Sequence, residues 1–475
     1  MQITDIERGL SQVLQVFRVI KNAYVPVNKI PPEILSSVLA HRHTESDLVA
    51  ATHVCKYWRS TLTSNPSLWT CLRFESSRDV DRTTTYLKRS KSVTIDIKIK
   101  MCSYQDVELL QQFASHISRA RSVVIQGSSG VHAASSLLLS NPAPSLESLE
   151  IRAHEGPARD LGNFLGQQAP SLRSVLFVGI SPVLGPSLSL PNLTTFHLYL
   201  PRSGPLHLTS CSLFQFLSTC PLLQDIAVYV PDETFQEVAL DRVTSLESLV
   251  ELEYRGYAAG RVLPHLKLPR LRRLDVSSTL PVGQVHKLAD ALPHGGRVLL
   301  GGATKMRYSS ESCMQRVDFS GEGTNVSIAI GSVGDSAPVD WFADESRTPF
   351  GQIEDLEVGG LYVPPTFSFH PFKKLTIFRL TSWDPQCIEG FLRFLYPTPG
   401  KGIPCPSLRE IRCSSWVPQE QIMGSIISLV RERDKAGYRL ELVCVFGMPK
   451  LDDDLEEELR RHVGELQVRI SEDHA

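Results

Sequence analysis

One arrangement of apolar residues returns along most of the chain: an apolar position, two spacers, a second apolar position, one spacer and a third. The alternation around its last two apolar positions predicts a short strand with one apolar face. Copies start about 20 to 30 residues apart, except for one gap of about three such periods after the copy at 269–276. Copies lie at residues 144–151, 170–177, 191–198, 221–228, 248–254, 269–276, 351–358, 373–380 and 406–413, with related stretches at 90–97 and 120–127.

Between several copies the apolar spacing changes to that of a helix of about three turns. Such patterns comprise Leu161, Phe164 and Leu165; Leu213, Phe216 and Leu217; Val285, Leu288 and Leu292; and Ile388, Phe391, Leu392 and Leu395. Strand, helix and strand in this order predict an α/β fold with parallel strands joined by right-handed crossovers. Because one unit cannot bury its apolar side alone, neighbouring units are expected to stack. A curved solenoid and a doubly wound open sheet both satisfy this alternation.

The repeated phrase is similar to that of leucine-rich repeats, which favours the solenoid, with parallel strands and outer helices over residues 75–450. The chain departs from that family three residues after the last strand anchor, where the family carries Asn or Cys and no copy here does. Repeats of irregular length and curvature are therefore expected. Residues 281–350 are the least regular, and they form either atypical repeats with a long loop or an insertion.

The strand spacers predict which side chains lie on the open face of the sheet, because side chains alternate between faces. Val178, Tyr199 and Tyr229 are equivalent in consecutive copies and are expected to form an apolar and aromatic patch, and Tyr is frequent in interfaces. Arg379 and Arg412 follow acidic residues at the equivalent positions of earlier copies, which gives a change of charge sign. These five residues are the candidate target-binding residues. Alternatively, a loop covers the patch and the charges are a solvated face.

Residues 28–74 have a different pattern, that of three short helices. Pro31 and Pro32 can begin a helix, because the first N–H groups of a helix have no intrahelical partner. So short a stretch cannot bury a substantial core. Large apolar residues left on its surface therefore suggest a docking module. The alternative is an ordinary helical cap whose core is Trp58 and Trp69.

Four runs within this stretch carry a family resemblance: Ile30–Leu35, Asp47–Ala51, Val54–Arg59 and Pro66–Trp69. In this order and spacing, residues 27–74 resemble an F-box, with Ile30 where Leu is commoner. The resemblance implies docking onto the Skp-family adaptor of cullin-based ubiquitin ligases, and the whole chain is similar to fungal F-box proteins with degenerate leucine-rich repeats. By position, the adaptor-binding residues that it implies are Pro31, Ile34, Leu35, Leu48, Val54, Cys55, Trp58, Leu68 and Trp69.

Composition narrows the partners and the compartment. The 475 residues carry a formal net charge of −2, which argues against general binding to nucleic acid or to a membrane surface. The sequence has no apolar run of about 18 residues and no basic, then apolar, start of the signal-peptide kind. We therefore expect a cytoplasmic or nuclear protein, or both. Ten scattered cysteines without a C-x-x-C pair favour free buried thiols over disulfides or zinc.

Catalytic signals in the sequence are weak. It contains neither H-E-x-x-H nor G-x-S-x-G, and the glycine-rich stretches at 301–305 and 400–402 lack the remaining residues of a phosphate loop. The fourteen histidines are dispersed, and His41 and His43 fall in a polar loop. We expect no enzymatic activity, no cofactor and no metal. A hydrolase on a repeat frame would need a nucleophile and a base close together.

The sequence patterns at both ends of the chain predict helices. Residues 1–26 form an amphipathic helix that either packs on the F-box or pairs with another chain; its apolar positions are Ile3, Ile6, Leu10, Val13, Leu14, Phe17 and Ile20. Residues 451–475 form a helix with an acidic start, and a tail.

Together these features predict the substrate-recognition subunit of a Skp-cullin-F-box ubiquitin ligase complex, whose solenoid binds an unknown target protein. The alternative is a non-catalytic leucine-rich-repeat scaffold whose F-box serves assembly rather than protein degradation.

Overall fold

The structure is a computed structural model of the chain. It describes residues 3–42, 45–101, 107, 110–128, 130–154, 159–161, 169–182, 190–200, 209–230, 243–257, 262–280, 292–293, 300–311, 314–332, 350–360, 368–382, 384–397, 402–415, 420–446 and 453–469. Two compact units divide the chain. The first comprises Met1–Gly156, Leu161–Val183 and Ser187–Leu190, and the second comprises Pro157–Asp160, Leu184–Pro186 and Pro191–Ala475.

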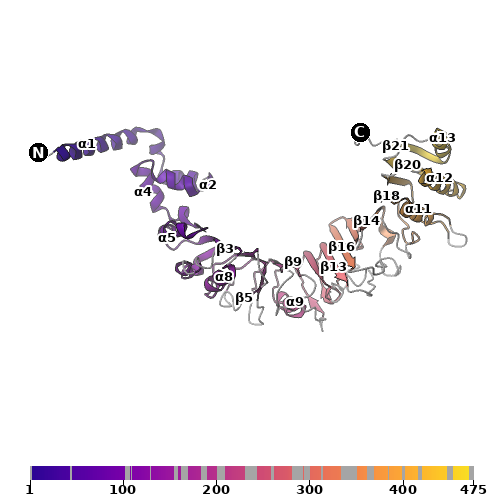
Figure 1. Cartoon of the computed structure of the whole chain (residues 1–475), viewed down its shortest axis with the longest axis horizontal. Coiled ribbons are helices and arrows are strands. Elements are labelled where there is room, and N and C mark those ends of the chain that lie inside the picture. Colours follow the sequence, from indigo (N-terminus) through magenta and orange to yellow (C-terminus); the bar gives the residue numbers. More distant parts are fainter. Residues whose placement is uncertain are drawn as a thin grey trace. The chain divides into compact units, whose positions relative to one another are not determined.

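The first unit begins with helices (Figure 1). They are α1 (Ile3–Tyr24), the 3-10 turn η1 (Pro26–Lys29), α2 (Pro32–Arg42), α3 (Glu45–Thr52), α4 (Lys56–Ser64) and the 3-10 turn η2 (Pro66–Trp69). The three short helices predicted for residues 28–74 are thus present as α2, α3 and α4. Their common core is small and consists of Leu35, Leu39, Ala51 and Leu62.

A row of parallel strands follows in the same unit. It runs β1 (Cys71–Phe74), β2 (Ile95–Met101), β3 (Ala120–Gly127), β4 (Ser148–Ala153) and β6 (Ser174–Val178), each paired with the next. The connections contain η3 (Ser77–Asp79), α5 (Val80–Arg89), α7 (Gln111–Ala114), η4 (Ile117–Arg119) and α8 (Val131–Leu139). The short strands β5 (Arg159–Leu161) and β7 (Ile180–Pro182) lie outside this row.

The second unit contains two further rows of parallel strands. One runs β8 (Thr195–Tyr199), β9 (Asp225–Tyr229), β11 (Glu251–Tyr257) and β13 (Arg273–Leu280). The other runs β17 (Asp355–Gly360), β18 (Ile377–Ser382), β19 (Glu410–Ser415), β20 (Leu440–Phe446) and β21 (Val463–Arg469). Helices α11 (Pro385–Arg393), α12 (Glu420–Lys435) and α13 (Asp453–His462) lie side by side along one side of β18 to β21 (Figure 1). Other elements are α9 (Ser210–Ser218), η7 (Leu263–His265), η9 (Phe350–Gln352) and the parallel pair β10 (Thr244–Ser245) and β12 (Leu266–Lys267).

An antiparallel meander joins these two rows within the irregular region 281–350. It consists of β14 (Ala303–Glu311), β15 (Met314–Gly321) and β16 (Thr324–Ser332). β16 pairs in parallel with β13, and β14 pairs in parallel with β17, so the strand order is β13-β16-β15-β14-β17. The expectation of parallel strands is therefore wrong for β15. The reason is the turn after it, which contains only Glu322 and Gly323, whereas a parallel connection needs a crossover of about a dozen residues or more.

The repeated phrase is confirmed as the source of the strands. Each copy overlaps a strand, and its first anchor is buried in every case: Leu146, Leu172, Leu193, Leu223, Leu249, Leu271, Ile353, Leu375 and Leu408. Of the four helical patterns, two form α9 and α11. The other two helical patterns fall mostly at residues 162–168 and 281–291, which lie outside the described residues.

The C-terminal segment differs from its prediction. The helix with an acidic start is present as α13, but β21 follows it and pairs in parallel with β20. The row of strands therefore continues beyond residue 450, where the sequence pattern had ended it. Within the described ranges, none of the helices combines the length and the apolar character needed to cross a bilayer.

Candidate functional site

The N-terminal helical module is held together by two aromatic side chains of α4. The Trp58 Nε1–H donates to Asn28 Oδ1 at 2.7 Å, and the Asn28 side-chain amide donates to the Asn22 carbonyl at 2.7 Å. The Tyr57 hydroxyl donates to the Ile30 carbonyl at 2.6 Å. These bonds fix the chain just before α2, so that α2 leaves η1 in a defined direction.

Several large apolar side chains of this module face solvent. Ile34 is 53% exposed and Val38 57%, and the two lie one turn apart on the same face of α2. Val49 in α3 is 36% exposed, and Val54 between α3 and α4 is 58% exposed. We call Ile34, Val38, Val49 and Val54 the exposed apolar set. A helical module with so small a core gains nothing in its own stability from apolar groups left in water, and exposed apolar groups that form a contiguous patch often mark an interaction site.

The predicted adaptor-binding residues divide into three groups by burial. Pro31, Ile34 and Val54 are exposed, whereas Cys55, Trp58 and Leu68 are half-buried. Leu35, Leu48 and Trp69 are buried and cannot contact a partner directly in this structure. Their side chains support the module from within instead. Val38 and Val49 were absent from the prediction, although Val38 follows Ile34 by one helical turn.

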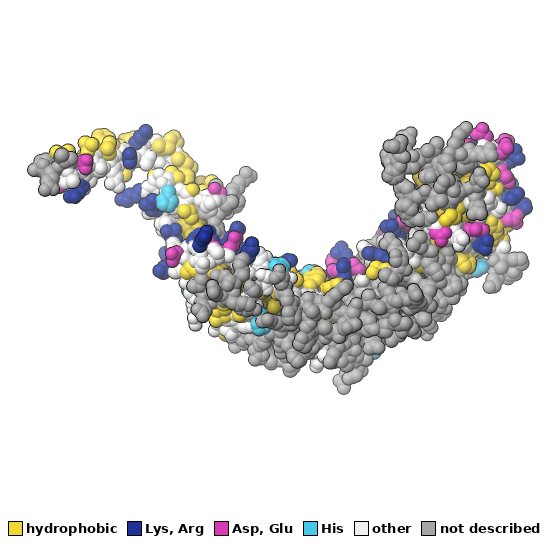
Figure 2. Space-filling model, in the orientation of Figure 1, with side chains coloured by type: hydrophobic (Ala, Val, Ile, Leu, Met, Phe, Trp, Pro, Cys, Tyr) yellow, Lys and Arg dark blue, Asp and Glu magenta, His cyan; other side chains and the backbone are white. Residues whose placement is uncertain are grey.

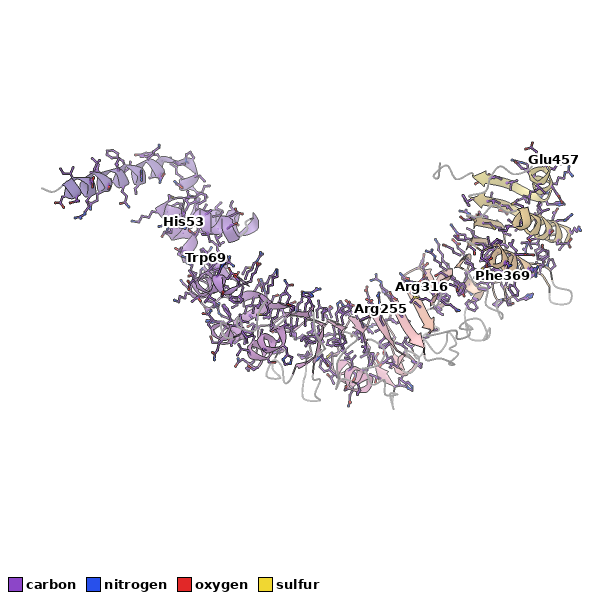
Figure 3. All side chains as sticks on the ribbon, viewed as in Figure 1. His53, Trp69, Arg255, Arg316, Phe369 and Glu457 are labelled. Carbon is purple, nitrogen blue, oxygen red and sulfur yellow. The ribbon has the colours of Figure 1, made fainter. Side chains whose placement is uncertain are left out.

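Trp69 lies between the helical module and helix α5, which follows the first strand of the sheet. Its side chain is 0% exposed, and its indole Nε1–H donates to the Leu62 carbonyl in α4 at 2.9 Å. Its ring meets the Tyr86 ring edge-on with centroids 4.9 Å apart, and the Arg89 guanidinium lies 4.4 Å from the ring centroid. Tyr86 and Arg89 both belong to α5, so Trp69 contacts both sides of the junction (Figure 3).

The open face of the first sheet carries a hollow of ≈ 350 Å³ with several cations around it. Arg73, Lys98 and Lys100 line it together with Val124 and Glu150. This face presents more positive than negative side chains at the hollow.

The open face of the second unit holds the predicted aromatic residues. Tyr199 on β8 lies opposite Tyr229 on β9 in the strand register, and Tyr229 lies opposite Arg255 on β11. Both Tyr side chains are half-buried. Val178, the third member of the predicted patch, lies on β6 in the first unit.

The predicted arginines are each paired with a carboxylate on the same face. Arg379 donates two hydrogen bonds to Asp355 on the neighbouring strand, at 3.0 and 2.8 Å, and these bonds raise the pKa of Arg379. Arg412 donates to Glu410 of its own strand at 2.7 Å. The same face holds the pairs Arg255–Glu253, Arg273–Glu251, Arg307–Glu357 and Arg316–Asp318; Figure 3 labels Arg255 and Arg316. Charges of both signs thus alternate over short distances, which suits a mixed polar protein surface better than a polyanion.

Two observations concern metal binding and thiol reactivity among the described residues. Among them, no group of three or more His, Cys, Asp or Glu side chains is arranged to hold a metal ion. Burial raises the pKa of Cys413 to about 12 and the pKa values of Cys220 and Cys387 to about 11. These thiols therefore stay protonated at neutral pH and are poor nucleophiles.

Comparison with known proteins identifies the helical module. No curated protein matches the chain. A family model described as F-box-like matches residues 27–75, which include η1 from Val27, the helices α2 to α4, η2 and β1. F-box domains generally bind Skp-type adaptors. The exposed apolar set and the half-buried Trp58 fall inside the matched range. The chain therefore carries an F-box-like domain at residues 27–75, which supports an F-box protein.

Proposed function

We propose that this protein is the substrate-recognition subunit of a Skp-cullin-F-box ubiquitin ligase. The observation that carries the proposal is the F-box-like domain with apolar side chains exposed on α2, on α3 and between α3 and α4. In this proposal the exposed apolar set docks onto a Skp-family adaptor, and the adaptor links the chain to a cullin. The protein acts in the cytoplasm, the nucleus or both.

The proposal includes a leucine-rich-repeat-like solenoid as the target-binding part. Its support is the phrase that recurs about every 20 to 30 residues, the parallel pairing of nearly all the strands and the helices along one side of β18 to β21. The open strand faces would bind a target protein. Tyr199, Tyr229, Arg379 and Arg412 are our candidates in the second unit. Partners are proteins rather than nucleic acid or membrane.

Such a receptor carries out no bond chemistry of its own. It holds the target close to a ubiquitin-conjugating enzyme, so that ubiquitin transfer occurs within one complex. The effective concentration of target lysines near that enzyme then rises, in the way that tethering raises the rate of any second encounter. No catalytic residue in this chain is needed for that role.

Substitution on the exposed face of α2 tests the adaptor contact. Ile34→Asp is expected to weaken adaptor binding by about tenfold or more, because an unpaired carboxylate in an apolar interface costs at least about 1.4 kcal/mol. The measurement is the Kd between the purified chain and a Skp-family adaptor by calorimetry. Ala40→Asp is the matched control: it places the same charge at another exposed position of α2, away from Ile34 and Val38. Equal affinities of the two variants would contradict the assignment of this face.

Substitution of the tyrosine pair tests the target-binding face. The double variant Tyr199→Ala, Tyr229→Ala is expected to lose most labelling of proteins that accumulate when the proteasome is inhibited, because it removes two large contact side chains from one row. Proximity labelling in cells, with and without inhibitor, measures this. Adaptor capture should stay unchanged. If the labelled proteins neither change with inhibitor nor require a cullin, the scaffold function is the correct one.

A further inference from the structure

The apolar residues of α1 follow a seven-residue repeat. Ile3, Ile6, Leu10, Val13, Phe17, Ile20 and Tyr24 succeed one another in alternating steps of three and four. An apolar repeat of this period keeps one seam of a helix facing a partner helix in a left-handed coiled coil. We call these residues the α1 seam. The helix is 22 residues long, so the seam extends over about three heptads or roughly 33 Å.

Within the part of the chain that the structure describes, the seam side chains from Ile6 to Tyr24 lie exposed. Leu10 is 63% exposed, Val13 54%, Phe17 65% and Ile20 49%. Figure 2 shows hydrophobic side chains gathered along this helix. The expectation that α1 packs on the F-box helices is therefore not met. The contact described for α1 is at its C-terminal end, where the Asn22 carbonyl accepts hydrogen bonds from Val25 N–H and from the Asn28 side chain.

The charges along α1 suit an antiparallel copy of the same helix. The first half carries Asp5 and Glu7, and the second half carries Arg18 and Lys21. Arg8 is the cation of the first half. Its Nη1 lies 3.6 Å from Asp5 Oδ1, so the Asp5 carboxylate offsets its charge. An antiparallel pair brings the acidic half of one helix against the basic half of the other. A parallel pair would instead place the two basic halves side by side, and likewise the two acidic halves.

The positions that flank the seam fix the geometry of such a pair. Glu7, Leu14 and Lys21 are seven residues apart and lie along one flank of the seam. In an antiparallel pair with interlocked seams, Glu7 faces the partner's Lys21, and Leu14 meets its own copy at the two-fold axis. The pair therefore gains two opposite-charge contacts and one apolar contact beside the seam. Leu14 is 50% exposed in the single chain, so its burial in the pair is a gain.

We propose that α1 pairs with α1 of a second copy of this chain in an antiparallel coiled coil, which makes the protein a dimer. The proposal stands on the α1 seam and its charges, and it does not depend on the proposed ligase function. The F-box-like domain follows α1 directly in each copy.

The first test is the mass of the full-length protein in solution. Light scattering at about 1 to 100 μM should give twice the chain mass of 52.8 kDa at the upper end, since a short coiled coil is expected to dissociate in the micromolar range. The double variant Leu10→Glu, Phe17→Glu should be monomeric throughout. The control Gln12→Glu, Gln15→Glu adds the same two charges off the seam and should remain dimeric. A wild-type monomer at all concentrations, or a seam variant that stays dimeric, overturns the proposal.

The second test is the direction of the pair. Leu14→Cys should form a disulfide-linked dimer under mild oxidation, because Leu14 meets its own copy only in the antiparallel arrangement. Leu10→Cys should not, because Leu10 meets its own copy in a parallel pair. Wild-type protein controls for the native cysteines. Cross-linking through Leu10 rather than Leu14 overturns the antiparallel arrangement. A wild-type monomer whose adaptor affinity falls with the seam variant would instead assign α1 to the adaptor.

Discussion

Replacing Trp69 with Ala is expected to lower the free energy of unfolding of the first unit by about 3–5 kcal/mol, the range found for large aromatic residues removed from cores. The ring is fully buried and contacts Tyr86 and Arg89, so its loss leaves a cavity between α4 and α5. The Leu62 carbonyl also loses one of its two donors and keeps the Asn65 N–H at 3.4 Å. Hydrogen exchange of residues 56–101 should show the largest loss of protection, because they lie on both sides of the junction.

Two further variants separate the causes of this effect. Trp69→Phe keeps most of the ring and removes the N–H, so it should cost about 1 kcal/mol, the usual net value of one hydrogen bond. Trp58→Ala removes a half-buried Trp from the same domain and should cost less than Trp69→Ala. Equal losses for the two alanine variants would contradict the role of Trp69 at the junction. Exchange measured residue by residue is preferable to one global transition, because a chain with two units need not unfold in one step.

Arg433→Met is expected to destabilise the C-terminal part of the second unit by about 2–4 kcal/mol. Arg433 in α12 is 0% exposed and donates to the Pro404 carbonyl at 2.9 Å and to the Cys405 carbonyl at 3.0 Å. Methionine fills much of the same volume but leaves both carbonyls without these donors. Burial lowers the pKa of Arg433, because desolvation disfavours the charged guanidinium. The two lost hydrogen bonds should outweigh the relief of that cost.

The matched control lies two residues away on the same helix. Arg431 is half-exposed and its guanidinium lies 3.4 Å from Glu458, so Arg431→Met should cost less than about 1 kcal/mol, as surface ion pairs do. Urea unfolding followed by circular dichroism measures both variants. Cys405 has a φ of 48°, a conformation that non-glycine residues seldom adopt, and the guanidinium donates to the carbonyls of this turn. If Arg433→Met lowers the free energy of unfolding no more than Arg431→Met does, the turn at Cys405 keeps its conformation without the guanidinium.

The strands were predictable because the repeated phrase encodes three inward side chains at fixed spacing. The same spacing is present in strands outside these copies: Ala303, Met306 and Tyr308 in β14, and Val463, Leu466 and Val468 in β21. In β15 it starts at Met314, which is 44% exposed, and continues with the buried Val317 and Phe319. Their first anchors are not the Leu or Ile of the other copies, and no proline opens them. Strand direction is a separate property. It depends on the length of the connection, which is why β15 is antiparallel although parallel strands were expected.

The F-box-like domain was predictable as a module, but the role of each residue was not. Ile34 and Leu35 are adjacent and equally apolar, yet one is exposed and the other packs on Leu39 and Leu62. The rotation of α2 that separates them is set by tertiary packing, which spacing alone does not specify. Trp69 shows a missed signal. With Leu72 and Phe74 it has the spacing of the repeated phrase, so it is also the first anchor of β1.

For the open face of the second unit, too, the sequence predicted residues but not their contacts. The sequence identified Arg379 and Arg412 as unusual cations, but it did not show their carboxylate partners. Asp355 lies on the preceding strand, two positions before Glu357, the equivalent of Arg379, and it reaches Arg379 only because β17 and β18 are neighbours. A charge pattern that compares only equivalent positions of successive copies therefore misses ion pairs between non-equivalent positions.

The meander β14-β15-β16 has a consequence for how the second unit folds. Its strands pair through short turns, so its contacts are local in the sequence and cheap in loop-closure entropy. The pairing of β13 with β16, in contrast, closes a loop across the whole meander. A meander that forms first presents one edge strand to β13 and another to β17. Folding can then spread from the middle of the unit in both directions, and substitutions in the meander should slow folding more than substitutions at β8 or β21.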